Sequence, residues 1–300
     1  NAWDSGEAYR VPIVFNISTR FWAEVLKVDP VRYFFDPIYQ MQMQLKGQKW
    51  VWENVPMDQR EPEQWIVFPD FQNFNEAGWL GCAIKYSKVD LGQTAPLPFI
   101  EKKEKFDFKI PDPLKANLMG RILKFRKVMM EESKNLMFAG KKVLVSDSCS
   151  FGSVGPFSLA MDLRGDKLLI DLYRDPEFAQ RLIEYTTEAI ITWMKAWYDY
   201  VGMDYPFDSF SFADDAIQHL SSDMYKKFVL PYHKKWVNTF SKNKKPNSIH
   251  LCGRVQQHLR TLKDELNIKF FELGYPTDLG KARIELGQDV TLKGNLNPVT

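Results

Sequence analysis

His250 and Cys252 stand one residue apart at the end of a short apolar run, residues 247–251. Such a run is typical of a β-strand, on which side chains two positions apart point to the same face. An imidazole and a thiolate side by side can supply half of a tetrahedral zinc site. The alternative is that both side chains are simply buried, since His and Cys also occur in protein cores. The pair is therefore a candidate metal site, and this interpretation requires further ligands close to it.

A carboxylate at a neighbouring strand end would extend this pair to three ligands. Residues 269–273 form the next expected strand, and Glu272 lies near its end. If the two strands pair, they lie about 4.8 Å apart and place Glu272 beside Cys252. Because zinc accepts nitrogen, sulfur and carboxylate oxygen ligands, we predict His250, Cys252 and Glu272 as metal ligands. The alternative for Glu272 is an exposed or salt-bridged carboxylate.

Two adjacent carboxylates follow another expected strand. Asp214 and Asp215 come after the strand predicted at 207–212, and we predict both as catalytic residues in contact with substrate. Helix capping ahead of Ser221 is the alternative, because Asp is a favoured residue at the start of a helix.

Three further residues are predicted to bind substrate. Asn295 follows the last expected strand, although an Asn after Gly294 is also typical of a turn. Asn16 and Arg20 lie at the end of the strand predicted over residues 11–17. Their positions at strand ends are the reason for this prediction.

The second half of the chain alternates expected strands with expected helices. Such alternation predicts an α/β fold with a parallel sheet, either an open doubly wound sheet or a closed (β/α)8 barrel. No G-x-G-x-x-G motif follows a strand, which weakens a dinucleotide-binding interpretation. In a barrel, the polar strand ends would form the rim where active sites occur. The expected strands are 142–146, 207–212, 248–252, 269–273 and 289–293, and the expected helices are 156–164, 175–202, 221–240, 254–267 and 278–286.

The first half of the chain is less regular. Residues 11–17 are predicted to form a strand and residues 36–49 a helix. Residues 50–110 are rich in Trp, Phe, Pro and Asn, a composition that indicates loops and hairpins instead of β/α units. We therefore predict one barrel domain over residues 1–300, with residues 50–110 as a loop and hairpin insertion over the barrel mouth.

The composition is that of an ordinary globular protein. Apolar residues make up 45% and charged residues 26% of the 300 residues, and the net charge is +2. This even balance argues against binding to nucleic acid or to an acidic membrane surface. Three widely spaced cysteines argue against a disulfide framework and favour a reducing, cytoplasmic location. No uncharged apolar run approaches the length of a membrane-spanning helix.

Five short motifs occur in an order that resembles a known family. Together they are similar to the uroporphyrinogen decarboxylase superfamily, which includes zinc-dependent, corrinoid-linked methyltransferases. The resemblance covers residues 140–300 well and residues 10–50 loosely. It implies a (β/α)8 TIM barrel, of which one strand and one helix are expected beyond Thr300. The motifs are GPFSLA at 155–160, DPE at 175–177, LSS at 220–222, HLCG at 250–253 and GNLNP at 294–298.

Two branches of the superfamily differ in their functional residues. The decarboxylases carry R-Q-A-G-R after the first strand to bind a tetrapyrrole, but the matching stretch at 15–20 keeps only Arg20. A polycarboxylate needs several fixed guanidinium groups. The methyltransferases carry His-x-Cys, matched by His250 and Cys252. Their methionine synthase relatives add a Glu, matched by Glu272, and a distant Cys that is expected beyond Thr300.

The resemblance therefore implies a corrinoid-dependent methyltransferase. Its cofactors would be zinc and a methyl-corrinoid carried by a partner protein. It would move a methyl group between that corrinoid protein and a small thiol or methoxy-type substrate. The alternatives are a uroporphyrinogen-type decarboxylase and a non-catalytic barrel that binds a corrinoid or tetrapyrrole.

Overall fold

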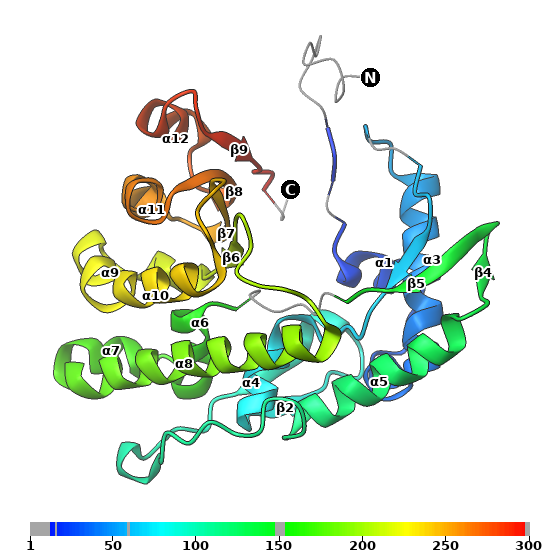
Figure 1. Ribbon diagram of the computed structural model, residues 1–300, viewed down its shortest axis with the longest axis horizontal. Helices are drawn as coiled ribbons and strands as arrows, with labels where there is room; N and C mark the ends of the chain where they lie inside the picture. The colour runs from blue at the N-terminus through cyan, green and yellow to red at the C-terminus, as the bar shows by residue number, and fades with distance from the viewer. Residues whose placement is uncertain (1–12, 16, 59–60, 148–153, 298–300) are drawn as a thin grey trace. The chain divides into compact units, whose positions relative to one another are not determined.

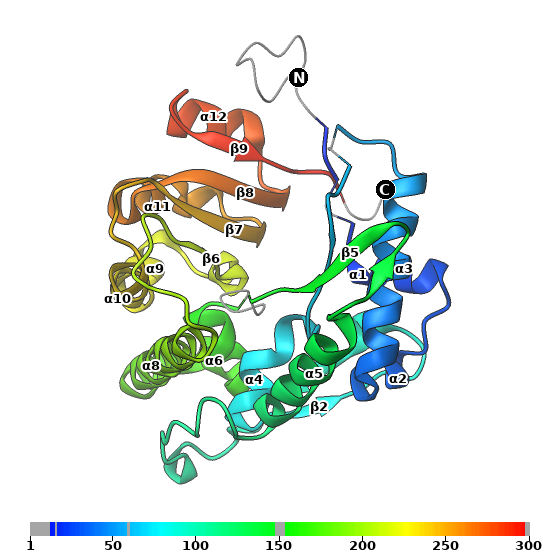
Figure 2. The same cartoon turned by 45° about the vertical axis from the view of Figure 1, so that its right-hand side comes forward.

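The computed structural model describes residues 13–15, 17–58, 61–147 and 154–297. The chain divides into two compact units, whose elements are labelled in Figure 1 and seen again in Figure 2. One unit comprises residues 1–71, 85–95 and 121–149, and the other comprises residues 72–84, 96–120 and 150–300. All three predicted metal ligands belong to the second unit, which is therefore described first.

The second unit contains a four-stranded parallel sheet. Its strands, in spatial order, are β6 (Ser211–Ala213), β7 (Asn247–Gly253), β8 (Ile268–Pro276) and β9 (Thr291–Lys293). The predicted alternation of helices with parallel strands is confirmed here. Only the strand predicted at 207–212 differs clearly, because regular pairing begins at Ser211.

The register of this sheet determines which side chains share a face. Ala213, His250, Glu272 and Lys293 stand opposite one another on the four strands. The preceding row, Phe212, Ile249, Phe271 and Leu292, points to the other face because strand side chains alternate. Figure 1 shows the connecting helices along that second face, where Phe212, Ile249 and Phe271 are buried.

Capping residues mark the ends of several helices in this unit. Asp175 accepts a hydrogen bond from Phe178 N, and Gly202 ends the same helix in the left-handed conformation. Ser221 and Asp278 cap two further helices through Met224 N and Lys281 N. The helices are α6 (Pro156–Arg164), α7 (Lys167–Arg174), α8 (Pro176–Val201), α9 (Ser222–Phe228), α10 (Leu230–Phe240), α11 (Leu259–Leu266) and α12 (Leu279–Leu286).

Three helix predictions need correction. The helix expected over 221–240 is two helices that meet at Val229, just before Pro231, a residue that suits the first turn of a helix. The helix expected over 254–267 starts as a short 3-10 turn, η5 (Gln256–His258), and is α-helical only in α11. Helix α7 was not expected.

The first unit contains a smaller sheet and a helical layer. Asp36 caps the long helix α3, which extends beyond the predicted 36–49. In the sheet, β5 lies between β1, its parallel neighbour, and β4, its antiparallel neighbour. The elements are α1 (Thr19–Val25), α2 (Pro30–Phe35), α3 (Pro37–Asn54), β1 (Trp65–Val67), η2 (Leu91–Gln93), β4 (Met137–Phe138) and β5 (Lys141–Val145). Elements at the unit boundaries, or in the small segments of the second unit, are η1 (Gln72–Phe74), α4 (Asn75–Leu80), β2 (Ala83–Lys85), β3 (Ala95–Leu97), η3 (Lys103–Lys105) and α5 (Leu118–Ser133).

Two predictions for the first half of the chain differ from the structure where its residues are described. The described residues of the expected strand at 11–17, namely 13–15 and 17, form no strand. The segment 50–110 is not composed of loops and hairpins alone, because β1 pairs in parallel with β5 as a β/α unit requires. Two of its Trp residues pack in the core: Trp65 donates to Phe138 O at 2.9 Å, and Trp79 stacks on Trp193.

Both units thus have the parallel strands and covering helices of an α/β fold. Closure of the strands into one eight-stranded barrel stays a prediction, as does a position of residues 50–110 over its mouth. Within the described residues, no helix combines the length and the apolar character needed to cross a membrane.

Candidate metal centre

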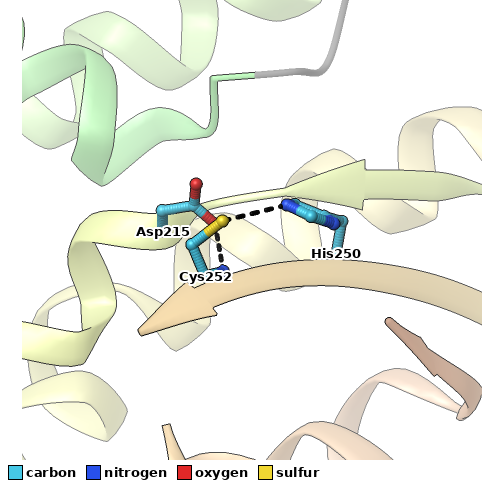
Figure 3. A group of neighbouring side chains, drawn as sticks. All are labelled: Asp215, His250 and Cys252. Carbon is cyan, nitrogen blue, oxygen red and sulfur yellow. Dashed lines mark hydrogen bonds between the residues drawn. The ribbon is translucent and has the colours of Figure 1, made fainter. Parts of the chain in front are cut away.

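Asp215, His250 and Cys252 bring their ligand atoms together at the end of β6 and β7. Figure 3 shows the three side chains converging, and their ligand atoms all lie within 4.8 Å of one another. His250 Nε2 is 3.2 Å from Cys252 Sγ, and Cys252 N donates to Asp215 Oδ1 at 2.7 Å. The prediction that His250 and Cys252 share a strand face is confirmed, and Asp215 joins them.

Backbone geometry around Cys252 fixes the direction of its side chain. Between Leu251 and Gly253 the pairing with β8 shifts by one extra residue on β8, a bulge that re-aims neighbouring side chains. Gly253 has a φ of +77°, and a Cβ there would lie 1.8 Å from Gln218 Oε1. On β8, a Cβ on Gly274 would lie 2.9 Å from Cys252 Cα. The positive φ of Gly253 and the close backbone approach at Gly274 therefore favour glycine at these two positions beside Cys252.

Glu272 lies on the other side of the His250 ring. Its Oε1 is 3.3 Å from His250 Nδ1, and its Oε2 accepts from Lys293 Nζ at 2.9 Å. The predicted ligand Glu272 is thus next to the cluster but faces the ring nitrogen that points away from Cys252. Lys293 was missed by the sequence analysis, because only the sheet register reveals that it stands opposite Glu272.

The electrostatics of the cluster favour a bound cation. Burial, the charge and hydrogen bond of Asp215, and the charge of Glu272 together raise the pKa of the Cys252 thiol to about 12. A cation at this position would reverse that effect, because it stabilises the thiolate and the carboxylates at once. An imidazole nitrogen, a sulfur and a carboxylate oxygen also form a donor set that zinc accepts, with a fourth position left for substrate. The chemistry of these residues therefore fits zinc.

Asp214 points into the protein instead of toward the cluster. Its buried carboxylate accepts hydrogen bonds from Phe157 N (3.0 Å), from Ser158 N (2.8 Å) and from Ser158 Oγ (2.6 Å) at the start of α6. His233 Nε2 lies 2.9 Å from Asp214 Oδ2. The predicted alternative, capping of the helix after Ser221, is not observed, since Ser221 caps that helix itself. Asp214 thus caps α6, and these hydrogen bonds fix the backbone directly before Asp215.

Asp162 on α6 should make stability depend on pH. Burial, reinforced by the charge of Asp214, raises the pKa of the Asp162 carboxyl from 3.8 to about 7. The folded state therefore holds this proton more tightly than the unfolded state, so the free energy of unfolding falls as pH rises from about 4 to 7. We expect Asp162→Asn to raise the free energy of unfolding by about 2–4 kcal/mol at pH 8 and to change it little at pH 4. Urea unfolding at both pH values measures this, and equal effects would contradict it.

The contacts described for the two other predicted substrate residues, Arg20 and Asn295, do not include residues of the cluster. Arg20 lies in the first unit, where it lines a cavity of about 340 Å³ together with Glu24, Lys27 and Asp90. Asn295 donates from Nδ2 to Thr277 O and ties the chain after β9 to the end of β8. Asn16 lies outside the described residues. Their substrate-binding roles stay predictions.

A second cysteine ligand is not seen among the described residues. Cys82 is buried, its Sγ lies 3.8 Å from Asp162 O, and burial raises its pKa to about 12. It is not part of the cluster formed by Asp215, His250 and Cys252. Cys149 lies outside the described residues.

Comparison with known proteins supports the family inferred from the motifs. The family model for uroporphyrinogen decarboxylase (URO-D) matches residues 52–300. A methylcobamide:CoM methyltransferase MtbA of Methanosarcina mazei is 24% identical over 226 residues, which is 75% of this chain and 62% of the relative. The protein of the same name from Methanosarcina acetivorans is 23% identical over 226 residues. A uroporphyrinogen decarboxylase of Pelodictyon phaeoclathratiforme is 28% identical over 127 residues, 42% of this chain and 35% of the relative.

A solved structure also has the same fold. A methyltransferase from Methanosarcina mazei matches with a TM-score of 0.65 and 16% identity, over 98% of this chain and 80% of that chain. The chain spans 62% of the length of the two methyltransferase relatives. Since the family model matches most of the sequence and the motifs occur in the expected order, the chain belongs to the uroporphyrinogen decarboxylase family.

Proposed function

We propose that this protein is a zinc-dependent methyltransferase that moves a methyl group between a corrinoid protein and a small thiol or methoxy-type substrate. The observation that carries the proposal is the convergence of Asp215, His250 and Cys252 at the end of two parallel strands. The two relatives named methylcobamide:CoM methyltransferase support methyl transfer. We favour a thiol as the acceptor and a methylcobamide as the donor, in agreement with those names.

In this proposal His250 and Cys252 hold zinc, with Asp215 as the nearest carboxylate. The predicted ligand Glu272 lies beside His250 Nδ1. A cysteine distant in the sequence is the candidate for a further zinc ligand. When bound, zinc would lower the pKa of the acceptor thiol so that it is ionised at neutral pH. The two carboxylates, and the thiolate that Cys252 would become on metal binding, would provide the negative charge that such a cation needs.

The protein's own residues orient this chemistry. Asp215 accepts from Cys252 N and so keeps the Cys252 side chain beside the His250 ring. The open side of this cluster would hold the acceptor sulfur, whose proton would be lost to solvent. A methyl-corrinoid, when bound by its carrier protein, would supply the methyl group to that sulfur and keep the electron pair of its former bond to methyl. We assign Asp214 a positioning role, because its carboxylate is already used at the start of α6.

The partner in this proposal is a protein that carries the corrinoid. A closed (β/α)8 barrel would present the cluster at its rim, where such a protein could reach it. A cytoplasmic location is part of the proposal, in keeping with the free thiols of Cys82 and Cys252.

The direct test is a methyl-transfer assay on the zinc-loaded protein. Methylcobalamin and a small thiol are mixed with the protein, loss of the Co–C bond is followed by absorbance, and the methylated thiol is identified by mass spectrometry. We expect turnover that depends on zinc. Decarboxylation of uroporphyrinogen without metal, or tight corrinoid binding with no methyl transfer, would contradict the proposal and support one of the two alternatives.

A further inference from the structure

Ser158, near the start of α6, contacts the chain on both sides of Asp215. Its hydroxyl donates a hydrogen bond to Asp214 Oδ1 at 2.6 Å. The same oxygen accepts a hydrogen bond from Ala216 N at 2.9 Å. A hydroxyl has one proton to donate and two lone pairs that accept, so it can make both bonds at once. Ser158 therefore joins the residue before Asp215 to the residue after it.

We propose that Ser158 is a positioning residue that holds Asp215 in the metal cluster. When the backbone is fixed on both sides of a residue, the direction of its side chain is fixed as well. The Asp215 carboxylate then reaches β7, where it accepts from Cys252 N at 2.7 Å. The inference rests on the proposed function for its effect on metal binding, but the position of Asp215 can be measured without metal.

The close approach of α6 to β6 makes this contact possible. A Cβ on Gly155, just before the helix, would collide with Ala213 O and with Asp214 Cβ, so the absence of a side chain there lets the two elements meet. Asp214 is fully buried and Ser158 is half-buried. Because water has little access to this contact, the two hydrogen bonds of the hydroxyl are hard to replace.

The start of α6 does not depend on the Ser158 hydroxyl. Asp214 also accepts from the backbone groups Phe157 N and Ser158 N, and it lies 2.9 Å from His233 Nε2. These three contacts need no serine side chain. Ala216 N, in contrast, donates to the hydroxyl itself. Removing the hydroxyl should therefore release the backbone after Asp215 while the helix stays capped.

The test compares Ser158→Ala with Ser158→Thr, which keeps a hydroxyl at this position. The Cys252 amide is the reporter in the metal-free protein, because it donates to the Asp215 carboxylate. In Ser158→Ala we expect this amide to exchange with solvent about 3–10-fold faster, as for the loss of one hydrogen bond. Zinc affinity, measured against a competing chelator, should fall about 10-fold, at the lower end of the range for residues that orient a ligand. Ser158→Thr should keep both values at those of the wild type.

Ser222→Ala is the matched control. Ser222 also lies at the start of a helix in the second unit, and its hydroxyl donates to Gln257 O at 2.7 Å. That bond is exposed and involves no residue of the metal cluster. The control substitution should change neither the exchange of the Cys252 amide nor the zinc affinity. In urea, Ser158→Ala should shift the unfolding midpoint only slightly, because α6 keeps its cap.

Three results would overturn the inference. The first is an unchanged Cys252 amide in Ser158→Ala, and the second is an equal loss in Ser158→Thr. The third is faster exchange of amides throughout the sheet, which would mean general destabilisation instead of a displaced Asp215. A wild-type protein that binds no zinc would refute the proposed function instead, and the Cys252 amide would still decide the positioning role.

Discussion

Replacing Cys252 by Ser is expected to abolish zinc retention and to lower methyl transfer by at least about 1,000-fold, equivalent to about 4 kcal/mol of transition-state stabilisation. Cys252 Sγ is the soft donor of the cluster, and it lies 3.2 Å from His250 Nε2. A serine hydroxyl is a poor zinc ligand because it does not ionise near neutral pH. Metal content by mass spectrometry and the methylcobalamin assay measure the two effects.

The control for this prediction is Cys82→Ala. Cys82 lies in the second unit as well, but it is buried and contacts Asp162 O instead of the cluster. Its replacement should leave zinc stoichiometry unchanged. If the Cys252→Ser protein retains a full equivalent of zinc, or if Cys82→Ala loses it, the proposed ligand set is wrong.

Replacing Asp214 by Ala is expected to lower the free energy of unfolding by about 3–5 kcal/mol. The carboxylate is fully buried, and its removal leaves Phe157 N, Ser158 N and His233 without their acceptor. A buried donor without a partner costs the full desolvation of that group. Urea denaturation followed by circular dichroism provides the measurement.

Asp208→Ala is the matched control for this substitution. Asp208 precedes the same strand, but its side chain is 48% exposed and its contact with Lys244 is 4.0 Å long. Loss of such a surface pair should change stability by less than about 1 kcal/mol. A loss of under 1 kcal/mol in Asp214→Ala as well would show that the α6 anchor is not needed for folding.

Much of the second unit could be predicted from the sequence because its signals are local. Asp175 and Gly202 mark both ends of α8, and the apolar alternation of residues 247–251 identifies β7. The same alternation places His250 and Cys252 on one face. These features depend on neighbours within a few positions along the chain, where sequence patterns are informative.

The errors have a different physical origin. Strand β1 has only three residues, so too little of it exists to produce an alternation pattern, and its identity depends on pairing with β5. Asp214 caps a helix that begins 58 residues earlier, at Pro156, which no local pattern encodes. The neighbours of Glu272 depend in the same way on the sheet register, which brings Lys293 opposite it.

The register row of His250, Glu272 and Lys293 would also link the proposed metal binding to folding. Its members come from separate strands with a crossover helix between each pair, so they meet only after the whole parallel sheet has formed. The unfolded chain keeps the His-x-Cys pair but not the carboxylates around it. A metal that prefers the assembled site stabilises the folded state by mass action, by about 2.7 kcal/mol when free metal is at 100 times its Kd. Under the proposed function, the local supply of zinc would set not only the activity of this protein but also the fraction of it that is folded.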